Sequence, residues 1–448
     1  MDASISYRRP ADWRWWLRQT QDPLLGRQAI TNYSQLVQSQ YWTPGQLAAA
    51  ADRKLAALLR QATRHVPFYR ELVPDARLTD FRPLPRTALQ HDDTALLADN
   101  RSRLLWTLHS SGTTGQRVTV KRDPAMQDMS TACAWLGDCW GAEIAPTDRQ
   151  VCLWGDPREH GARDTLKNRL SSFYHNRYIL GAFMVNAQRA RQVHRLLWRL
   201  RPRLIYGYPT SLMAYARFAG ELGLQPPPVA KVLPVAEHCY PQDAEVLRAY
   251  FGAPVLERYG SHEMGCIAHQ CEHGTWHLHS GHVLLEVLRD DGSIAGNGAG
   301  ALLCTSLSNY SMPLIRYDIG DYAELCSSAC PCGRGLPTFR NLEGRLGQFV
   351  FCPDGRWITS HGFLAPLRHF EIGSFQLRQE EPGRVIVLLA HAQLDSAGLA
   401  FLQAEYEKLH GGTLRVDFEY VDEIPLLPNG KRSRVQCLLP RPDNVVIS

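Results

Sequence analysis

The middle of the chain alternates between two patterns of apolar residues. Short continuous apolar runs are typical of buried strands, and longer stretches with apolar residues every three or four positions are typical of helices. The runs predict strands at 150–155, 204–208 and 232–235, and the longer stretches predict helices at 126–141, 187–200 and 209–222. Strands that alternate with helices form βαβ units, so we expect an α/β fold with a largely parallel sheet.

Helical spacing dominates the first hundred residues. Thr43 and Pro44 form a helix start, with Thr43 as the N-cap, and leucines then recur at helical spacing to about Val66. Earlier, the segment 13–18 contains three Trp and two Arg residues. Such a segment is compatible with a patch on a membrane surface. We favour the alternative, a helix that packs its Trp face against the protein.

Two later regions have the pattern of paired strands. Residues 282–288 and 301–304 are expected to form a hairpin with a turn at 290–292. Beyond Gly344 the pattern predicts strands at 375–377, 385–388 and 414–420 and a helix from about 396 to 410. We therefore expect a large N-terminal domain, residues 1–344, with mixed and parallel sheets flanked by helices plus a β-hairpin region. Residues 345–448 would form a small α+β C-terminal lid domain.

Composition narrows the class of protein. The 448 residues exceed what one core usually holds, so two or more domains are expected. A hydrophobic content of 44% and a charged content of 21% are typical of globular proteins, and a net charge of +5 does not indicate nucleic-acid binding. No apolar run is long enough to span a bilayer, and the first ten residues lack the apolar core of a secretory signal. The scattered cysteines predict a cytoplasmic protein with reduced thiols. The oligomeric state stays open, with a homodimer as one option.

A hydroxyl-rich loop, Ser110 to Gly115, lies between apolar segments at 104–106 and 118–120. Backbone N–H groups of a Gly-containing loop can surround a phosphate, and Ser and Thr add side-chain donors. The loop lacks the Gly-Lys-Ser/Thr of the Walker pattern. By itself it is equally well explained as an ordinary hairpin turn.

Further along, other stretches carry candidate chemistry. Tyr259-Gly260-Ser261-His262-Glu263 combines an aromatic ring for stacking on a base with a carboxylate for a metal–phosphate, although a buried turn would also account for it. Asp321 follows a Gly turn at a strand end, where a carboxylate can bind both hydroxyls of a ribose or simply satisfy its own turn. Two more basic residues follow Gly residues, Arg345 and Lys431.

The order and spacing of these motifs resemble those of the adenylate-forming ligases, and more narrowly the phenylacetate–CoA ligase branch, from about residue 40 to 435. The resemblance implies that the ATP phosphates are held by Ser110, Ser111, Gly112, Thr113, Thr114 and Gly115. It assigns the rest of the nucleotide to Glu237, Tyr259, Gly260, Ser261, Asp321 and Arg345, and the acid to Tyr208, Pro209, His238 and His262. It further implies that Glu263 binds Mg²⁺ and that Lys431, on a rotating C-terminal domain, joins Glu263 and Arg345 in catalysis.

The sequence departs from the pattern of these ligases in three places. The phosphate loop continues into Gln116-Arg117 where Pro-Lys is common, and Gln348 stands where the hinge often carries Asp or Lys. His262 replaces a residue that is often Thr or Ser. None of these changes removes a required charge, but they leave the hinge position and the acid preference open.

A cluster of Cys and His residues lies between 266 and 332. Some relatives carry a structural zinc on a Cys-x5-His and Cys-x-Cys set, which here corresponds to Cys271, His277, Cys330 and Cys332. A Cys₃His set closes a tetrahedral site and is therefore structural rather than catalytic. Rival ligands are Cys266, His269, His273 and Cys326. The alternative is a group of buried thiols beside a His-rich loop.

The resemblance implies an ATP-dependent activation of a carboxylic acid to an acyl-adenylate with release of pyrophosphate, followed by acyl transfer to coenzyme A. ATP, Mg²⁺, coenzyme A and a structural Zn²⁺ are the expected cofactors. The expected pocket is rich in Trp, Tyr and Phe, which fits an aromatic acid. Many apolar cores have the same composition. The acceptor could instead be an amine or a carrier-protein thiol. A nucleotide-binding protein without turnover is a further alternative. In every case we expect neither nucleic acid nor a membrane as a partner.

Overall fold

The computed structural model describes most of the chain. The described residues are 12–89, 94–109, 118–154, 166–181, 187–237, 239, 241–289, 291–326, 328–343, 349–353, 357–359, 366, 367, 370, 372, 374–390, 393–424 and 435–439. Four groups of predicted site residues lie outside them: the loop Ser110 to Gly115, His238, Arg345 and Lys431. Their roles stay predictions.

Three helices begin the described chain, α1 (Trp13–Leu24), α2 (Ala29–Ser39) and α3 (Pro44–His65). The predicted start of α3 is confirmed, because the side chain of Thr43 accepts a hydrogen bond from the Gln46 backbone and the Gln46 side chain accepts one in return. Of the three Trp residues of α1 only Trp15 is buried, while Trp13 and Trp16 stay about half exposed or more. The Trp face therefore packs against the protein only in part. Short 3-10 turns follow at Pro67–Tyr69, Leu78–Asp80, Arg86–Leu89 and Thr94–Leu96.

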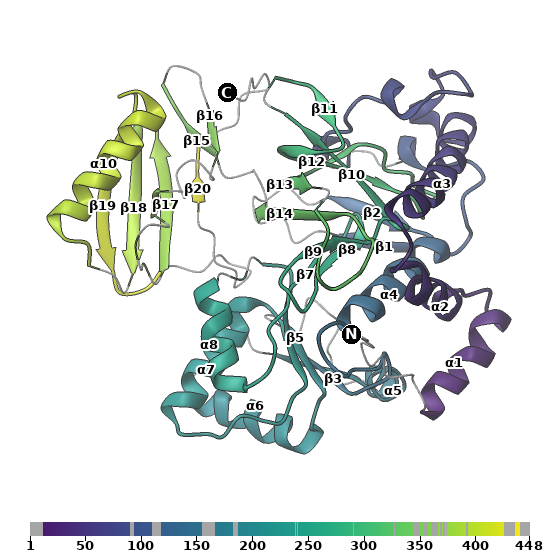
Figure 1. The fold of residues 1–448 in the computed structure, drawn as a ribbon, viewed down its shortest axis with the longest axis horizontal. Helices are drawn as coiled ribbons and strands as arrows, with labels where there is room; N and C mark the ends of the chain where they lie inside the picture. Colours follow the sequence, from purple (N-terminus) through teal and green to yellow (C-terminus); the bar gives the residue numbers. More distant parts are fainter. Residues whose placement is uncertain are drawn as a thin grey trace.

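The predicted parallel sheet is confirmed. Its four strands are β3 (Gln150–Trp154), β4 (Arg177–Gly181), β5 (Leu204–Gly207) and β6 (Lys231–Pro234), in the order β4-β3-β5-β6. The helices around it are α5 (Leu166–His175), α6 (Ala187–Leu200), α7 (Pro209–Glu221) and α8 (Pro241–Phe251), whereas α4 (Pro124–Asp138) packs against α2 and strand β8 of the other sheet. Figure 1 shows α6, α7 and α8 along one side of this sheet, where they share a core with β3 and β5. α4 starts and ends two to three residues before the predicted bounds.

A second sheet is antiparallel and has eight strands, in the order β11-β10-β12-β13-β14-β9-β8-β7. Its strands are β7 (Arg258–Ser261), β8 (Gly265–Gln270), β9 (Trp276–Leu278), β10 (Val283–Leu288), β11 (Ile294–Ala295), β12 (Gly298–Ser306), β13 (Tyr317–Cys326) and β14 (Thr338–Glu343). β10 pairs with β12 as predicted, with Leu288 opposite Ala301. The connection differs from the prediction, because β11 forms a short strand between them and pairs on the outer side of β10. The turn near residue 291 therefore joins β10 to β11.

A separate two-stranded hairpin consists of β1 (Trp106–His109) and β2 (Thr119–Arg122), with His109 opposite Thr119. These strands confirm the apolar flanks predicted around the hydroxyl-rich loop. Their register brings the two ends of that loop next to each other. The hairpin thereby fixes where residues 110–117 begin and end.

The C-terminal elements have a core of their own, which contains residues between Val350 and Val435. They are β15 (Phe349–Phe351), β16 (Trp357–Thr359), β17 (Ser374–Glu381), β18 (Arg384–Ala390), α10 (Ser396–His410), β19 (Arg415–Val421) and β20 (Val435–Cys437). The predicted strand pair and helix are confirmed, and the sheet order is β19-β18-β17-β20. Figure 1 shows α10 covering one face of this sheet. In the described residues, no helix combines the length and the apolar character that crossing a bilayer requires.

Candidate active site

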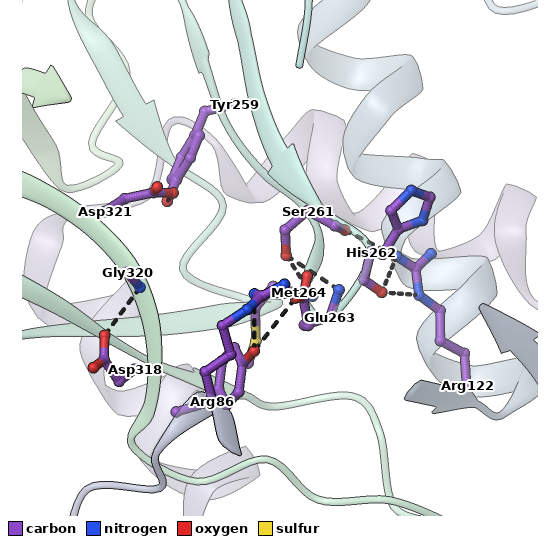
Figure 2. Close-up of polar contacts among 11 residues, drawn as sticks. Arg86, Arg122, Tyr259, Ser261, His262, Glu263, Met264, Asp318, Gly320 and Asp321 are labelled. Atoms are coloured by element: carbon purple, nitrogen blue, oxygen red, sulfur yellow. Dashed lines mark hydrogen bonds and ion pairs between the residues drawn. The ribbon is translucent and has the colours of Figure 1, made fainter. Parts of the chain in front are cut away.

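Tyr259 and Asp321 meet although their strands are not neighbours in the antiparallel sheet. The hydroxyl of Tyr259 in β7 donates to Oδ2 of Asp321 in β13 at 2.5 Å (Figure 2). Irregular register in β7 and β13 is consistent with the strong twist that this contact needs. Burial and the Asp321 carboxylate raise the pKa of Tyr259 well above its usual value, so the phenol stays a donor. The aromatic ring and the carboxylate assigned to the nucleoside thus lie side by side.

Glu263 is 1% exposed and lies on the turn between β7 and β8. Its Oε1 accepts a hydrogen bond from Nη1 of Arg86 at 2.8 Å (Figure 2). It also accepts one from the hydroxyl of Tyr317 at 3.3 Å. Carboxylate oxygen is a ligand that Mg²⁺ prefers, so the donor type fits the predicted ion. The ion pair with Arg86 means that a bound Mg²⁺ would share this carboxylate with a guanidinium. Arg86 lies in a short 3-10 turn and no motif in the sequence indicates it.

The turn that carries Glu263 is held by Arg122 at the end of β2. Its guanidinium donates to the carbonyl oxygen of His262 at 2.7 and 3.1 Å and to that of Ser261 at 3.0 Å. Within the turn, the hydroxyl of Ser261 accepts from the backbone N–H of Glu263 at 3.2 Å and of Met264 at 3.0 Å. Burial lowers the pKa of Arg122 to about 10, which still leaves it charged near neutral pH. Sequence analysis did not single out Arg122.

Gly260 is required by the close pairing of β7 and β8. A Cβ at this position would lie 2.5 Å from the carbonyl oxygen of Gly265, which no side chain tolerates. Both Gly260 and the neighbouring His262 are exposed, so this side of the turn is open to a ligand. Backbone without a side chain lets a flat group approach closely, as the assignment of Gly260 to the nucleotide requires.

Other predicted residues lie at the carboxyl ends of two parallel strands. Tyr208 follows β5 and is 4% exposed, and Pro209 is the first residue of α7. Glu237 follows β6 and is half-buried, directly after Ala236, which has a positive φ of 64°. Ligands of open α/β sheets bind beyond the carboxyl ends of the strands. The structure therefore brings Tyr208, Pro209 and Glu237 to one edge of the sheet.

The predicted zinc ligands converge. Sγ of Cys271 lies 3.6 Å from Sγ of Cys330, and Sγ of Cys332 lies 3.3 Å from Nε2 of His277. All four ligand atoms lie within 4.8 Å of one another. Two thiolates on a tetrahedral Zn²⁺ are separated by roughly 3.8 Å, given Zn–S bonds of about 2.3 Å. Burial lowers the pKa of His277 to about 4, which keeps the imidazole neutral, the form that binds metal.

A second group, Cys266, His269 and His279, also lies within 4.8 Å. Here a hydrogen-bonded chain accounts for the arrangement. Nε2 of His269 lies 3.1 Å from Oδ1 of Asp138, and its Nδ1 lies 2.9 Å from Nε2 of His279. Both distances are ordinary hydrogen-bond lengths. Of the rivals considered for the first site, Cys266 and His269 therefore belong to this chain instead.

Known proteins with this architecture include acid–CoA ligases. 2-Hydroxyisobutyryl-CoA ligase, in the postadenylation state with an acyl-AMP, superimposes over 98% of this chain and 95% of its own, with a TM-score of 0.66 and 16% identity. The chain has the fold of an adenylate-forming CoA ligase. The amide bond synthetase McbA of Marinactinospora thermotolerans matches 72% of this chain and 66% of its own, with a TM-score of 0.50 and 17% identity.

The similarity in sequence to a known protein covers less of the chain than the similarity in structure. Protein CapK of Staphylococcus aureus is 23% identical over 265 residues, which are 57% of this chain and 58% of CapK. The match thus spans less than two thirds of that relative. No protein-family model matches the sequence. The likeness to solved structures therefore supports the fold and leaves the activity to be argued from the site.

Proposed function

We propose that the protein is an ATP-dependent acid ligase. It converts a carboxylic acid to an acyl-adenylate with release of pyrophosphate and then transfers the acyl group to coenzyme A. The observation that carries the proposal is the joint placement of Tyr259, Asp321 and the buried Glu263 in a fold shared over nearly its whole length with a ligase that holds an acyl-AMP. A stacking ring, a ribose carboxylate and a metal carboxylate are what an adenylate requires.

In this proposal each residue has a defined task. Tyr259 and Gly260 lie along the adenine, Asp321 binds the ribose with Arg345, and the loop 110–115 holds the phosphates. Mg²⁺, when bound at Glu263, offsets phosphate charge. Lys431 approaches the forming bond between carboxylate and α-phosphate, where a desolvated cation stabilises the transition state.

One structural feature supports a mobile C-terminal domain that begins after Gly344. The C-terminal elements have a hydrophobic core of their own, separate from the cores of the two N-terminal sheets. Separate cores permit relative motion of domains. We propose that this domain carries Lys431 to the site for adenylation and rotates away for acyl transfer.

We also propose a structural Zn²⁺ on Cys271, His277, Cys330 and Cys332. The convergence of four suitable donors from β9 and two loops supports it. Such an ion would tie the loop at 330–332 to the antiparallel sheet. It has no open position for substrate.

Product analysis tests the function and identifies the acceptor. The protein is incubated with aromatic and aliphatic acids, ATP and Mg²⁺, with coenzyme A, with amines, or with neither. AMP, pyrophosphate and an acyl-CoA are expected. An amide without any thioester would instead support an amide-forming ligase, which the likeness to McbA favours as the second candidate. Absence of AMP with every acid would support a nucleotide-binding protein without turnover.

A further inference from the structure

The ion pair between Arg86 and Glu263 has one buried and one accessible member. The side chain of Glu263 is 2% exposed, whereas that of Arg86 keeps 22% of its surface exposed. Figure 2 shows the guanidinium directed at the carboxylate, with Nη1 of Arg86 2.8 Å from Oε1 of Glu263. A buried carboxylate without a counter-charge is strongly unfavourable. Before any metal ion binds, Arg86 therefore supplies a counter-charge to Glu263.

The backbone holds Arg86 in this position. Two residues earlier, Leu84 pairs with β13 through two backbone hydrogen bonds of 2.9 Å, on either side of Tyr317. The hydroxyl of Tyr317 donates to the same oxygen of Glu263 that Arg86 contacts. Leu84 and Leu89, before and after Arg86, are each 2% exposed and anchor the 3-10 turn in the core. The ion pair is thus a fixed feature of the fold.

A second cation lies near Glu263, but its hydrogen bonds go to the backbone. The guanidinium of Arg122 donates to the carbonyl oxygens of Ser261 and His262. Burial lowers the pKa of Arg122, and the negative charge of Glu263 opposes that fall. A divalent ion that approaches Glu263 would therefore meet two positive charges. Of these, Arg86 makes the direct contact with the carboxylate.

Charge distinguishes a free divalent ion from one that is bound to ATP. Free Mg²⁺ is repelled by the guanidinium groups of Arg86 and Arg122, and partly buried charges at short range are screened little by salt. The complex of Mg²⁺ with ATP carries a net negative charge, so the same two groups attract it. Electrostatics at Glu263 therefore disfavours the free ion and favours the ion that comes with its nucleotide.

We propose that Arg86 reserves Glu263 for a divalent ion that arrives with ATP. This inference rests on the proposed ligase function, and it makes Arg86 a positioning residue, because it acts through Glu263. Without nucleotide, Arg86 keeps a free ion from the carboxylate. Without a metal ion, Arg86 offsets the negative charge of Glu263, which would otherwise repel the phosphates of ATP. Arg86 and the metal ion are thus alternative counter-charges for one carboxylate.

The first test measures the binding of a free ion to the protein without nucleotide. Mn²⁺ serves as the probe at pH 8, because electron paramagnetic resonance distinguishes bound from free Mn²⁺. Arg86→Met should bind Mn²⁺ at least about tenfold more tightly than the wild type, since it lacks the competing charge. Arg86→Lys keeps that charge and should stay close to the wild type. Adding Glu263→Gln to Arg86→Met should abolish the gain, which identifies Glu263 as the ligand.

The second test measures ATP binding by calorimetry, with a chelator or with Mg²⁺. Without a divalent ion, Arg86→Met should bind ATP at least about tenfold more weakly than the wild type, because the charge of Glu263 is no longer offset. Added Mg²⁺ should restore most of the lost affinity. The substitution thus strengthens binding of the free metal ion and weakens binding of the free nucleotide. A merely structural role of Arg86 would not produce these opposite changes.

Arg82→Met is the matched control, because Arg82 is exposed and lies four residues earlier in the same segment. It should bind Mn²⁺ and ATP as the wild type does, and thermal unfolding shows whether each variant is folded. A folded Arg86→Met variant with unchanged or weaker Mn²⁺ binding would overturn the inference. So would a loss of ATP affinity that is equal with and without Mg²⁺. A wild type that binds ATP neither with nor without Mg²⁺ would instead contradict the ligase proposal itself.

Discussion

Replacing Arg122 by Met should remove the hydrogen bonds that hold the turn carrying Glu263 in place. The guanidinium makes three hydrogen bonds to the carbonyl oxygens of Ser261 and His262, between 2.7 and 3.1 Å. Bonds from a charged donor contribute about 1.5–3 kcal/mol each, so about 4.5–9 kcal/mol is lost. Removing the buried charge returns part of this, because the fall in its pKa from 12.5 to about 10 corresponds to roughly 3 kcal/mol. The net loss of unfolding free energy should therefore be about 1.5–6 kcal/mol.

The same substitution should lower activity more than the loss of stability explains. A turn without its anchor no longer holds Glu263 in one position, and small misplacements of catalytic groups cost about a hundredfold in rate. Urea unfolding gives the stability, and pyrophosphate exchange well below the unfolding transition gives the activity. Arg122→Lys keeps the charge with fewer donors and should be intermediate. A folded Arg122→Met variant that keeps exchange within about twofold of the wild type would refute this reasoning.

Three further predictions concern the zinc site, the buried histidines and the nucleoside contact. The purified protein should contain about one equivalent of zinc by elemental analysis, and Cys332→Ser should lose it and unfold at lower temperature; an unchanged metal content would refute the site. Burial lowers the pKa of His282 to about 3 and that of His269 to about 4, so the unfolded chain binds more protons between pH 6.5 and 4. Unfolding free energy should therefore fall with decreasing pH by about 2 kcal/mol per histidine at pH 5, and His282→Gln should flatten this dependence. Tyr259→Phe removes the 2.5 Å bond to Asp321, so it should lower the unfolding free energy by about 1.5–3 kcal/mol and raise the KM for ATP several-fold. An unchanged KM in the folded variant would separate this pair from the nucleotide.

Local elements could be predicted because their signals are local. The amphipathic stretch at 187–200 and the capped start at Thr43 each contain the physical cause of their helix, and both helices form. Strand β11 has two residues and no pattern of its own, so its insertion beside β10 was not predicted. The start of α4 differs because Asp123 caps the helix two residues earlier than the periodicity indicated.

The site residues also divide into those with a local sequence signal and those without one. Glu263 and Asp321 lie in short motifs, so sequence could nominate both. Arg86 contacts Glu263, which is 177 positions further along the chain, and Arg122 contacts His262, which is 140 positions further. No motif near either arginine indicates these contacts. Contacts between charged residues that are far apart in sequence can be identified only once the folded structure is known.

The central claim is that the protein forms an acyl-adenylate, and acid-dependent exchange of labelled pyrophosphate into ATP measures that step before any acceptor is involved. The account predicts exchange with at least one acid in the wild type and none in Lys431→Ala. It also predicts that Lys431→Ala still forms the thioester from supplied acyl-adenylate and coenzyme A, because the lysine serves only adenylation. Loss of both steps in the folded variant would contradict the rotating domain. Absence of exchange in the wild type across aromatic and aliphatic mono- and dicarboxylic acids would contradict the central claim.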